Sequence, residues 1–309
     1  MSIILDKVNH SYSAGTAYHV QALKDINLKI EDGEFIGIIG HTGSGKSTLI
    51  QHMNGLIKAT SGGIYFNGQD IYDEDFSMKE LRSKVGLVFQ YPEHQLFETT
   101  IFDDVCFGPK NLGLDKTTVE LRAYEALKSV NFPDELFYQP PFDLSGGQKR
   151  RVAIAGVLAM QPEVLILDEP TAGLDPKERI RIRNYISEFS KDKIVLLATH
   201  VVSDVEYIAK EILVMKQGKI LKKGTPQELI ADMEHKVFEV FVTEEEQRKY
   251  QESKHTIANI MFTTDRICLR IVSDHKPDIG IVEEVRPNLE DVYLYLIIFA
   301  VVVVVFITG

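Results

Sequence analysis

A phosphate-binding loop is the feature that most constrains what this chain can fold into. Residues 40–47 read GHTGSGKS, after an apolar run at 34–39 that predicts a strand and before a predicted helix at 48–54. Glycines let such a loop turn tightly and bring its N–H groups to phosphate oxygens at a helix N-terminus. Lys46 is expected to contact the β and γ phosphates, and Ser47 to bind Mg²⁺. The predicted nucleotide-binding residues are Gly40, His41, Thr42, Gly43, Ser44, Gly45, Lys46, Ser47 and Thr48.

Composition narrows the classes of protein that need to be considered. The 309 residues are 44% hydrophobic and 26% charged, which is ordinary for a globular protein. The net charge is −11 without a basic cluster, which argues against a nucleic-acid partner. Cys106 and Cys268 lie far apart, so we expect neither a disulfide framework nor a zinc site, and a reducing cytosol fits. The first residues lack the pattern of a signal peptide.

Two stretches near the N-terminus, 3–8 and 22–30, alternate apolar and polar residues as strands do. We expect them to form an antiparallel pair beside the phosphate loop. Tyr12 follows the first stretch and could stack on an adenine ring. Its spacing fits a half-buried strand tyrosine equally well.

A second apolar strand is predicted at 85–89, and Gln90 follows it. A glutamine at the carboxyl end of a strand can reach a bound Mg²⁺ or the attacking water, while the loop beyond it contacts a partner. By itself the residue says little, because most glutamines after strands have no such role.

Polar residues also follow two continuous apolar runs, 164–167 and 194–198, that suit the centre of a parallel sheet. Asp168 could hold Mg²⁺, and Glu169 could polarise the attacking water. His200 could donate to the γ phosphate, although a lone histidine after a strand is usually structural. Asp175 lies in a turn just beyond the paired acids.

A helical insertion is predicted between the two halves of the sheet, at about 99–138. Within it, six apolar residues are expected to lie mostly on one helix face: Val119, Leu121, Ala123, Ala126, Leu127 and Val130. The insertion ends at two prolines, and a further helix then starts and runs through Ala159. Its start is a second candidate anion site, for a different nucleotide. The residues of this start are Ser145, Gly146, Gly147 and Gln148.

Together these motifs resemble, in order and context, the ATPase subunits of ABC transporters over residues 2–233. The resemblance implies that Tyr12 stacks on the adenine of ATP, that Gln90 couples hydrolysis to a partner, and that Glu169 is the catalytic base. It implies that His200 is a switch histidine and that residues 145–148 contact the ATP of the opposite subunit. Hydrolysis then needs a head-to-tail hetero- or homodimer with two ATP molecules at its interface.

A finer resemblance lies in residues 91–98 and 104–113, YPEHQLFE and DVCFGPKNLG. These segments are similar to energy-coupling factor importers of vitamins and to the related cobalt and nickel systems, especially to their second ATPase subunit. Such systems pair two ATPases with a transmembrane coupling subunit, and a substrate-binding membrane subunit joins indirectly.

The last third is more similar to ATPases of antibiotic and lipid exporters, which carry a small αβ tail ending in a Leu-Glu-Asp-Val segment. We therefore expect a hybrid of two sources, with a join near 175–183. The final apolar stretch, 294–308, is shorter than the roughly 20 residues that a spanning helix needs. It fits a buried strand, a truncated membrane segment or a sequence artefact.

The sequence thus predicts an α/β P-loop NTPase of the ABC ATPase type. The expected parts are a mostly parallel sheet, an antiparallel β subdomain, a helical subdomain at 79–157, a small αβ domain at 230–293 and an apolar tail at 294–309, with the ATPase domain at 1–229. The predicted function is ATP hydrolysis that powers uptake, at the cytoplasmic face of the membrane. An exporter ATPase and a soluble ABC-type ATPase of DNA repair or translation are the alternatives.

Overall fold

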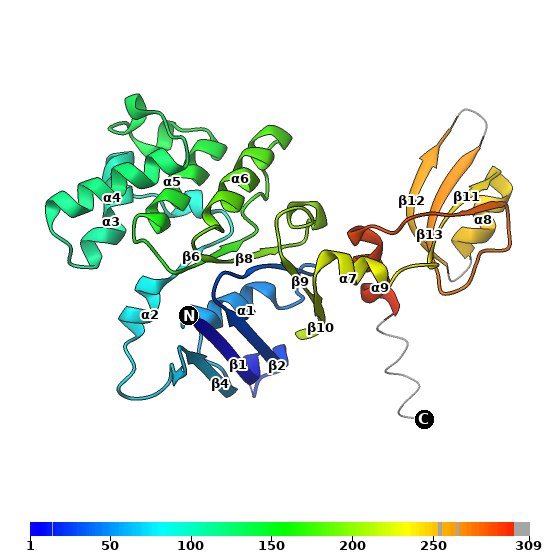
Figure 1. Cartoon of the computed structure of the whole chain (residues 1–309), viewed down its shortest axis with the longest axis horizontal. Coiled ribbons are helices and arrows are strands. Elements are labelled where there is room, and N and C mark those ends of the chain that lie inside the picture. The colour runs from blue at the N-terminus through cyan, green and yellow to red at the C-terminus, as the bar shows by residue number, and fades with distance from the viewer. Residues whose placement is uncertain (14, 253–254, 264–265, 300–309) are drawn as a thin grey trace.

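The computed structural model describes residues 1–13, 15–252, 255–263 and 266–299, and its largest element is a six-stranded sheet (Figure 1). The strand order is β10-β9-β3-β8-β7-β6. All neighbouring pairs are parallel except β9 and β10, so the predicted mostly parallel sheet is present. The strands are β3 (Phe35–Ile39), β6 (Val85–Val88), β7 (Val164–Asp168), β8 (Ile194–Thr199), β9 (Glu211–Lys216) and β10 (Lys219–Gly224).

The central strands are buried on both faces, which explains their uninterrupted apolar sequence. Along β7, Leu165 and Leu167 belong to one core cluster, and Val164 and Ile166 to another. Helix α1 (Lys46–Met53) lies on one side of the sheet, and α5 (Gly146–Leu158) and α6 (Pro176–Phe189) lie on the other (Figure 1). Successive side chains of a strand point to opposite faces of the sheet, so each central strand contributes to two separate hydrophobic layers.

The expected N-terminal strand pair belongs to a four-stranded antiparallel sheet of order β2-β1-β4-β5. Ile3 faces Ile30 on one neighbour and Phe66 on the other, so alternate side chains of β1 pack against α1 in a shared core. The strands are β1 (Ser2–Tyr12), β2 (Val20–Glu31), β4 (Ser61–Phe66) and β5 (Gln69–Asp70).

The region between β5 and β7 is mostly helical, but β6 within it pairs with β7 in the large sheet. Its helices are α2 (Met78–Lys84), the 3-10 helix η1 (Pro92–Gln95), α3 (Ile101–Asn111), α4 (Lys116–Ser129), η2 (Asp134–Leu136) and η3 (Pro141–Asp143). The expected apolar face of α4 is correct except at Leu121, which is 55% exposed. Leu121 lies two residues from both Val119 and Ala123, and residues two apart do not share a helix face.

The C-terminal part contains a separate four-stranded sheet of order β12-β13-β11-β14. Helix α8 places Tyr250 in the cluster formed by one face of this sheet. Helix α9 packs back toward the large sheet, because Leu289 and Val292 share a core cluster with Val202 and Val205 (Figure 1). The elements are η4 (Val202–Asp204), α7 (Pro226–Ala231), β11 (Val237–Val242), α8 (Glu244–Glu252), β12 (Thr256–Phe262), β13 (Ile267–Val272), β14 (Ile281–Glu284) and α9 (Leu289–Phe299).

The apolar stretch at the end of the chain differs from one of its expected structures. Residues 294–299 continue α9, so the buried-strand interpretation is wrong for them. Helix α9 follows Asn288, whose side chain accepts the N–H of Asp291, and such a cap favours a helical start. Residues 300–309 lie outside the described residues. Within the described part of the chain, no helix is long and apolar enough to cross a membrane.

Candidate nucleotide site

The candidate site forms where four neighbouring parallel strands end at one edge of the large sheet. Strands β3, β8, β7 and β6 are adjacent in that order, and parallel strands present their carboxyl ends on the same side. Residues that the sequence singled out on four separate segments thereby meet around a cavity of about 180 Å³. Its lining residues are Thr42, Gly43, Gly45, Lys46, Ser47, Thr48, Gln90, Glu169 and His200.

The phosphate loop needs glycine at specific positions. Gly43 and Gly45 have φ values of +81° and +104°, which favour residues without a side chain. At Gly40 a Cβ would lie 2.5 Å from the hydroxyl oxygen of Ser44 and 2.6 Å from the carbonyl oxygen of Met215. The loop therefore turns tightly under β9, and α1 begins directly after it at Lys46.

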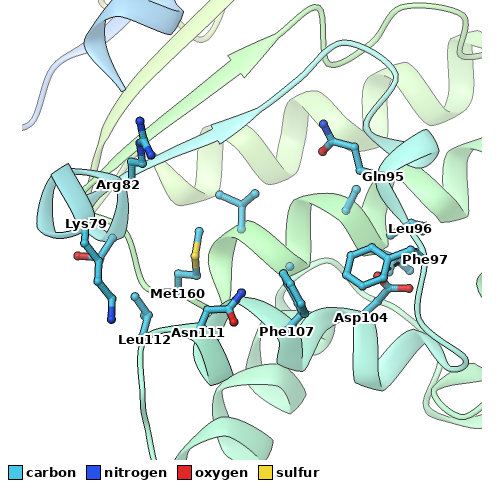
Figure 2. Close-up of a pocket in the computed structure, with 16 residues that line it drawn as sticks. Lys79, Arg82, Gln95, Leu96, Phe97, Asp104, Phe107, Asn111, Leu112 and Met160 are labelled. Atoms are coloured by element: carbon cyan, nitrogen blue, oxygen red, sulfur yellow. Dashed lines mark hydrogen bonds between the residues drawn. The ribbon is translucent and has the colours of Figure 1, made fainter. Parts of the chain in front are cut away.

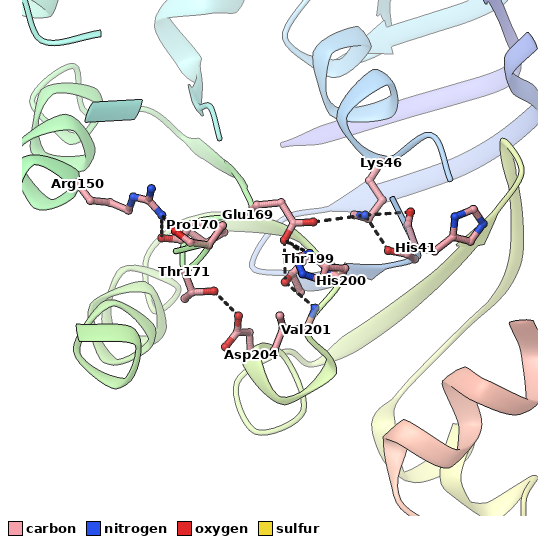
Figure 3. Close-up of polar contacts among 12 residues, drawn as sticks. His41, Lys46, Arg150, Glu169, Pro170, Thr171, Thr199, His200, Val201 and Asp204 are labelled. Atoms are coloured by element: carbon pink, nitrogen blue, oxygen red, sulfur yellow. Dashed lines mark hydrogen bonds and ion pairs between the residues drawn. The ribbon is translucent and has the colours of Figure 1, made fainter. Parts of the chain in front are cut away.

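Lys46 points back along the loop and is 6% exposed (Figure 3). Its ammonium group donates to the carbonyl oxygen of Gly40 at 2.8 Å and to that of His41 at 3.4 Å. It also lies 3.4 Å from Glu169 Oε1. A buried cation in a tight loop at a helix start is suited to bind phosphate.

Glu169 is the most densely contacted carboxylate of the site (Figure 3). Its Oε2 accepts from the Thr199 hydroxyl at 3.2 Å and from the His200 N–H at 3.3 Å. The Nδ1 atom of His200 lies 2.9 Å from the same oxygen. The backbone at Glu169 has φ +47° and donates to Ala198, so the turn after β7 fixes the side chain against β8.

Asp168 ends β7 beside Ser47 and is almost fully buried. Burial raises the pKa of this carboxyl group, Glu169 adds to the increase, and Ser47 and Lys46 oppose it. Its Oδ1 is buried and has no hydrogen-bond partner among the described residues. Asp168 itself does not line the cavity, but its unpartnered carboxylate oxygen lies beside Ser47, which does, and this pair fits the oxygen ligands that Mg²⁺ prefers.

Tyr12, at the end of β1, contacts the phosphate-loop helix. Its hydroxyl group lies 3.2 Å from Thr48 Oγ1, and its ring, 41% exposed, meets His10 edge to face at 4.6 Å. His10 in turn contacts the buried His52 of α1 at 4.7 Å between ring centroids. The partly exposed face of Tyr12 thus lies next to the loop and remains available for a flat ligand.

Two sets of predicted residues do not line the same cavity. Ser145 caps α5, where its hydroxyl accepts from the Gln148 N–H at 3.3 Å and Gln148 accepts in return from the Ser145 N–H at 2.9 Å. Asp175 caps α6 by accepting from Lys177 and Glu178. Ser145, Gly146 and Asp175 are all exposed, and none of them lines the cavity at the chain's own phosphate loop.

Sequence reasoning missed Thr199 and Arg150. Thr199 is fully buried, donates to Glu169 and accepts from the Val201 N–H at 3.0 Å. Arg150 is 1% exposed and bonds to Glu93 and to the carbonyls of Pro170 and Ala172. Thr199 could have been predicted, because it directly precedes His200. The pairing of Arg150 with Glu93 could not, because it spans 57 residues and leaves no local sequence pattern.

The segment that follows Gln90 in the chain lines an apolar groove with residues 95–97 (Figure 2). The groove measures about 610 Å³ and is lined by parts of α2, α3, α5 and the segment after η1. Phe97 is 60% exposed and meets Phe107 edge to face at 4.9 Å. Asp104 accepts from the N–H groups of Phe97 and Glu98, and burial raises its pKa. The segment is therefore fixed in place with its aromatic side chain outward.

Known proteins share this architecture and sequence. Residues 23–172 match the family model described as ABC transporter. The energy-coupling factor transporter ATP-binding protein EcfA2 of Caldanaerobacter subterraneus subsp. tengcongensis is 56% identical over 237 residues, which are 76% of this chain and 82% of the relative. The structure of cbiO1 from Clostridium perfringens, part of the ABC transporter complex cbiONQ, has a TM-score of 0.66 at 41% identity and covers 74% of this chain and 90% of that one. A bacterial ABC transporter cassette solved as a dimer has a TM-score of 0.65 at 31% identity, covering 72% and 98%.

The fold, the sheet-edge site and these similarities define a class of protein: the chain belongs to the ATP-binding subunits of ABC transporters, which are ATPases coupled to transport. Within that family its similarity is to the energy-coupling factor proteins, as residues 91–98 and 104–113 predict. The predicted fold class and ATP binding are thereby confirmed. A match of 237 residues extends past a join at 175–183, and the hybrid origin stays a prediction.

Proposed function

We propose that this chain is one of the two ATPases of an energy-coupling factor transporter and drives uptake of a vitamin or metal ion through a transmembrane coupling subunit. A separate substrate-binding membrane subunit would join indirectly. The observation that carries the proposal is the apolar groove with the exposed Phe97, because the segment that lines it follows shortly after Gln90, which lines the ATP site. The sequence similarity to energy-coupling factor proteins supports import over the exporter and soluble alternatives.

In this proposal each residue around the cavity has a defined task. Tyr12 stacks on adenine, and Lys46 and the loop N–H groups hold the phosphates. Ser47, Gln90 and Asp168 hold Mg²⁺, which offsets charge on the phosphate oxygens when bound. Glu169 accepts a proton from the attacking water, and His200 contacts the γ phosphate. The contacts of Glu169 with Thr199 and His200 support this assignment, because they orient its carboxylate.

The second anion site is proposed to serve a partner's nucleotide. Residues Ser145–Gln148 and Asp175 are then at the interface of a head-to-tail dimer with another ABC ATPase, either a second copy or a different subunit. The exposure of Ser145, Gly146 and Asp175, and the absence of all five residues from the lining of the chain's own cavity, support this arrangement. The related cassette that was solved as a dimer shows that such chains associate.

The division of the chain is part of the same proposal. The ATPase domain is residues 1–229, with its helical subdomain at about 79–157, and the small αβ domain is 230–293. The separate sheet β12-β13-β11-β14 supports the boundary between residues 229 and 230. A peripheral position at the cytoplasmic face of the membrane follows from coupling to a membrane subunit through the groove.

Assembly through the groove can be tested with Phe97→Asp. The isolated variant is expected to keep its ATPase activity but to lose co-purification with an energy-coupling factor transmembrane subunit encoded in the same genome. The reason is that an unpaired carboxylate in an apolar contact costs on the order of several kcal/mol. Tyr138→Asp is the matched control, because Tyr138 is 74% exposed but lines a different surface of the helical region.

The outcomes separate the candidate functions. Loss of assembly in Phe97→Asp alone supports the groove as the docking site. Normal assembly of Phe97→Asp contradicts it. If the unmodified chain binds an exporter permease and no energy-coupling factor subunit, the exporter alternative replaces the proposal.

A further inference from the structure

Arg150 is a buried arginine whose hydrogen-bonding capacity is completely used. A guanidinium group carries five N–H donors in a rigid fork. The Nε and Nη2 atoms donate to the carboxylate of Glu93 at distances of 3.2 and 2.9 Å. The Nη1 atom donates to the carbonyl oxygens of Pro170 at 3.0 Å and Ala172 at 2.8 Å (Figure 3). Because each side of the fork is committed to a different segment, Arg150 joins two parts of the chain that are far apart in sequence.

The first segment is η1, which leads directly into the apolar groove. Glu93 lies inside η1, Gln95 at its end lines the groove, and so do Leu96 and Phe97, which follow it. The ring of Tyr91, the residue between Gln90 and η1, lies 5.8 Å from the Arg150 guanidinium carbon. A change in the position of η1 therefore reaches Arg150 through a charge-assisted, two-point contact.

The second segment is the turn that follows Glu169. Pro170 is the next residue in the chain, and the turn is closed by hydrogen bonds from Ala172 to Glu169 and from Leu174 to Thr171. Glu169 has a positive φ, so its side-chain direction depends on how this turn is held. Arg150 is the side chain that holds both carbonyls of the turn from the side of α5.

We propose that Arg150 is a positioning residue: it transmits the position of η1, and thus of the groove, to the turn that orients Glu169. The inference rests on the proposed role of Glu169 and of the groove, but the Arg150 link itself does not depend on either. A neighbouring arginine provides the contrast. Arg151 is also buried, but its hydrogen bonds among the described residues go to the carbonyls of Val130 and Asn131, just after α4, and not to η1 or the turn.

The link is tested by hydrogen exchange on the nucleotide-free full-length chain. In Glu93→Gln and in Arg150→Lys, the amides of Ala172 and Leu174 are expected to exchange at least about tenfold faster, because the turn loses its external anchor. The amides of β7 are expected to keep their protection, which a general loss of stability would not allow. Arg151→Lys is the matched control, and its turn is expected to exchange as in the unmodified chain.

A further variant guards against loss of folding. Removing one partner leaves a buried charge, whereas Glu93→Leu combined with Arg150→Met removes both charges. This double variant is expected to fold and to show the same fast exchange in the turn. Normal protection of Ala172 and Leu174 in the folded double variant would overturn the link.

Steady-state ATP hydrolysis then tests positioning. The kcat of Glu93→Gln, of Arg150→Lys and of their combination is expected to fall to a similar extent, on the order of tenfold, with KM for ATP unchanged. Equal effects of the single and combined changes indicate one shared link, and multiplying effects contradict it. Fast exchange of the turn with unchanged kcat would overturn the positioning role. If Glu169→Gln remains fully active, the proposed base is wrong while the exchange result stands.

Discussion

Lys46 and Glu169 form a buried ion pair, with 3.4 Å between Nζ and Oε1. The two residues follow β3 and β7, which are separated in the sheet by β8. The cation expected to bind phosphate is thus paired with the carboxylate expected to activate water. Phosphate oxygens would compete with Glu169 for Lys46, so ATP binding is expected to release Oε1 of Glu169, while Oε2 keeps its contacts with Thr199 and His200.

Lys46→Ala is expected to weaken ATP binding by at least about 100-fold, because the phosphates lose a charge-assisted contact with a buried cation. Isothermal titration calorimetry measures the affinity. Lys58→Ala is the control, since Lys58 lies over the ring of Tyr72 and away from the loop. Unchanged affinity in a folded Lys46→Ala protein would remove Lys46 from the site.

Glu169→Gln is expected to keep ATP affinity, to lower turnover at least about 100-fold, and to accumulate an ATP-bound dimer, because an amide cannot accept the proton. Phosphate release and gel filtration measure the two effects. Glu163→Gln, a change at an exposed acid that pairs with Lys84 before the same strand, is expected to leave both unchanged. Hydrolysis at the unmodified rate by Glu169→Gln would make His200 the next candidate.

Ser145→Arg is expected to block hydrolysis by at least about tenfold without weakening ATP binding to the monomer, because a bulky cation would then occupy the surface meant for a partner's nucleotide. Ser145→Ala separates this effect from loss of the helix cap, which costs about 1 kcal/mol. Loss of ATP binding by the Ser145→Arg monomer would show that this helix start acts within its own chain.

Asp168→Asn is expected to stabilise the nucleotide-free chain while removing the dependence of ATP binding on Mg²⁺. Burial raises the pKa of Asp168 in the folded state, so its contribution to stability is full below the ordinary aspartate pKa of about 3.9 and is lost as pH rises through the higher folded value. At neutral pH the ionised group therefore opposes folding. Thermal melts at pH 7 are expected to show a Tm higher by a few degrees, roughly 2–4 °C per kcal/mol.

The difference in Tm between Asp168→Asn and the unmodified chain is expected to shrink as the pH is lowered toward 4, because the raised pKa of Asp168 makes it increasingly protonated over this range. Calorimetric titrations with and without Mg²⁺ provide the second readout. A lower Tm for Asp168→Asn at pH 7 would contradict the burial argument.

Asp291→Asn tests how α9 is attached. Arg270 donates to both carboxylate oxygens of Asp291, at 2.9 and 2.7 Å, and Asp291 is 1% exposed. The amide of the variant side chain cannot replace both carboxylate oxygens that Arg270 contacts. Breaking a buried ion pair in this way typically lowers the free energy of unfolding by about 3–5 kcal/mol. Limited proteolysis after Asn288 is expected to accelerate clearly, whereas Glu290→Gln at the adjacent exposed position is the control and is expected to leave the rate unchanged.

The sequence patterns picked out residues of the candidate site that the structure brings together, whereas they described some of the surrounding elements less well. Gly40–Ser47 and the residues after β7 and β8 belong to short local patterns whose chemistry depends on strand ends, and the structure brings them together at one sheet edge. Leu121 is the exception on the apolar face of α4, because alternating small and apolar residues do not show which of them point toward the core. The strands β12 and β14 lie at the edges of their sheet and carry exposed apolar residues, so their sequence gave little signal of periodicity.

The contacts of Arg150 could not have been predicted at all from one sequence. The residue stands in a helix start rich in charge, where an exposed side chain is the normal expectation. Its burial depends on the carboxylate of Glu93, which lies in η1, 57 residues earlier in the chain. Long-range pairing of this kind becomes visible only when the packing of α5 against η1 is known.

The hydrophobic cluster that includes Val202, Val205 and Leu229 also includes Val237, Val272 and Val292. The small C-terminal sheet and α9 therefore complete a core that the ATPase part leaves open, and cutting the chain after Leu229 would create a bare apolar surface. Such a shortened protein is expected to aggregate. For the same reason the C-terminal unit cannot be exchanged freely. A C-terminal unit from another ATPase would need side chains that pack against α7 and η4, which restricts such exchanges in evolution.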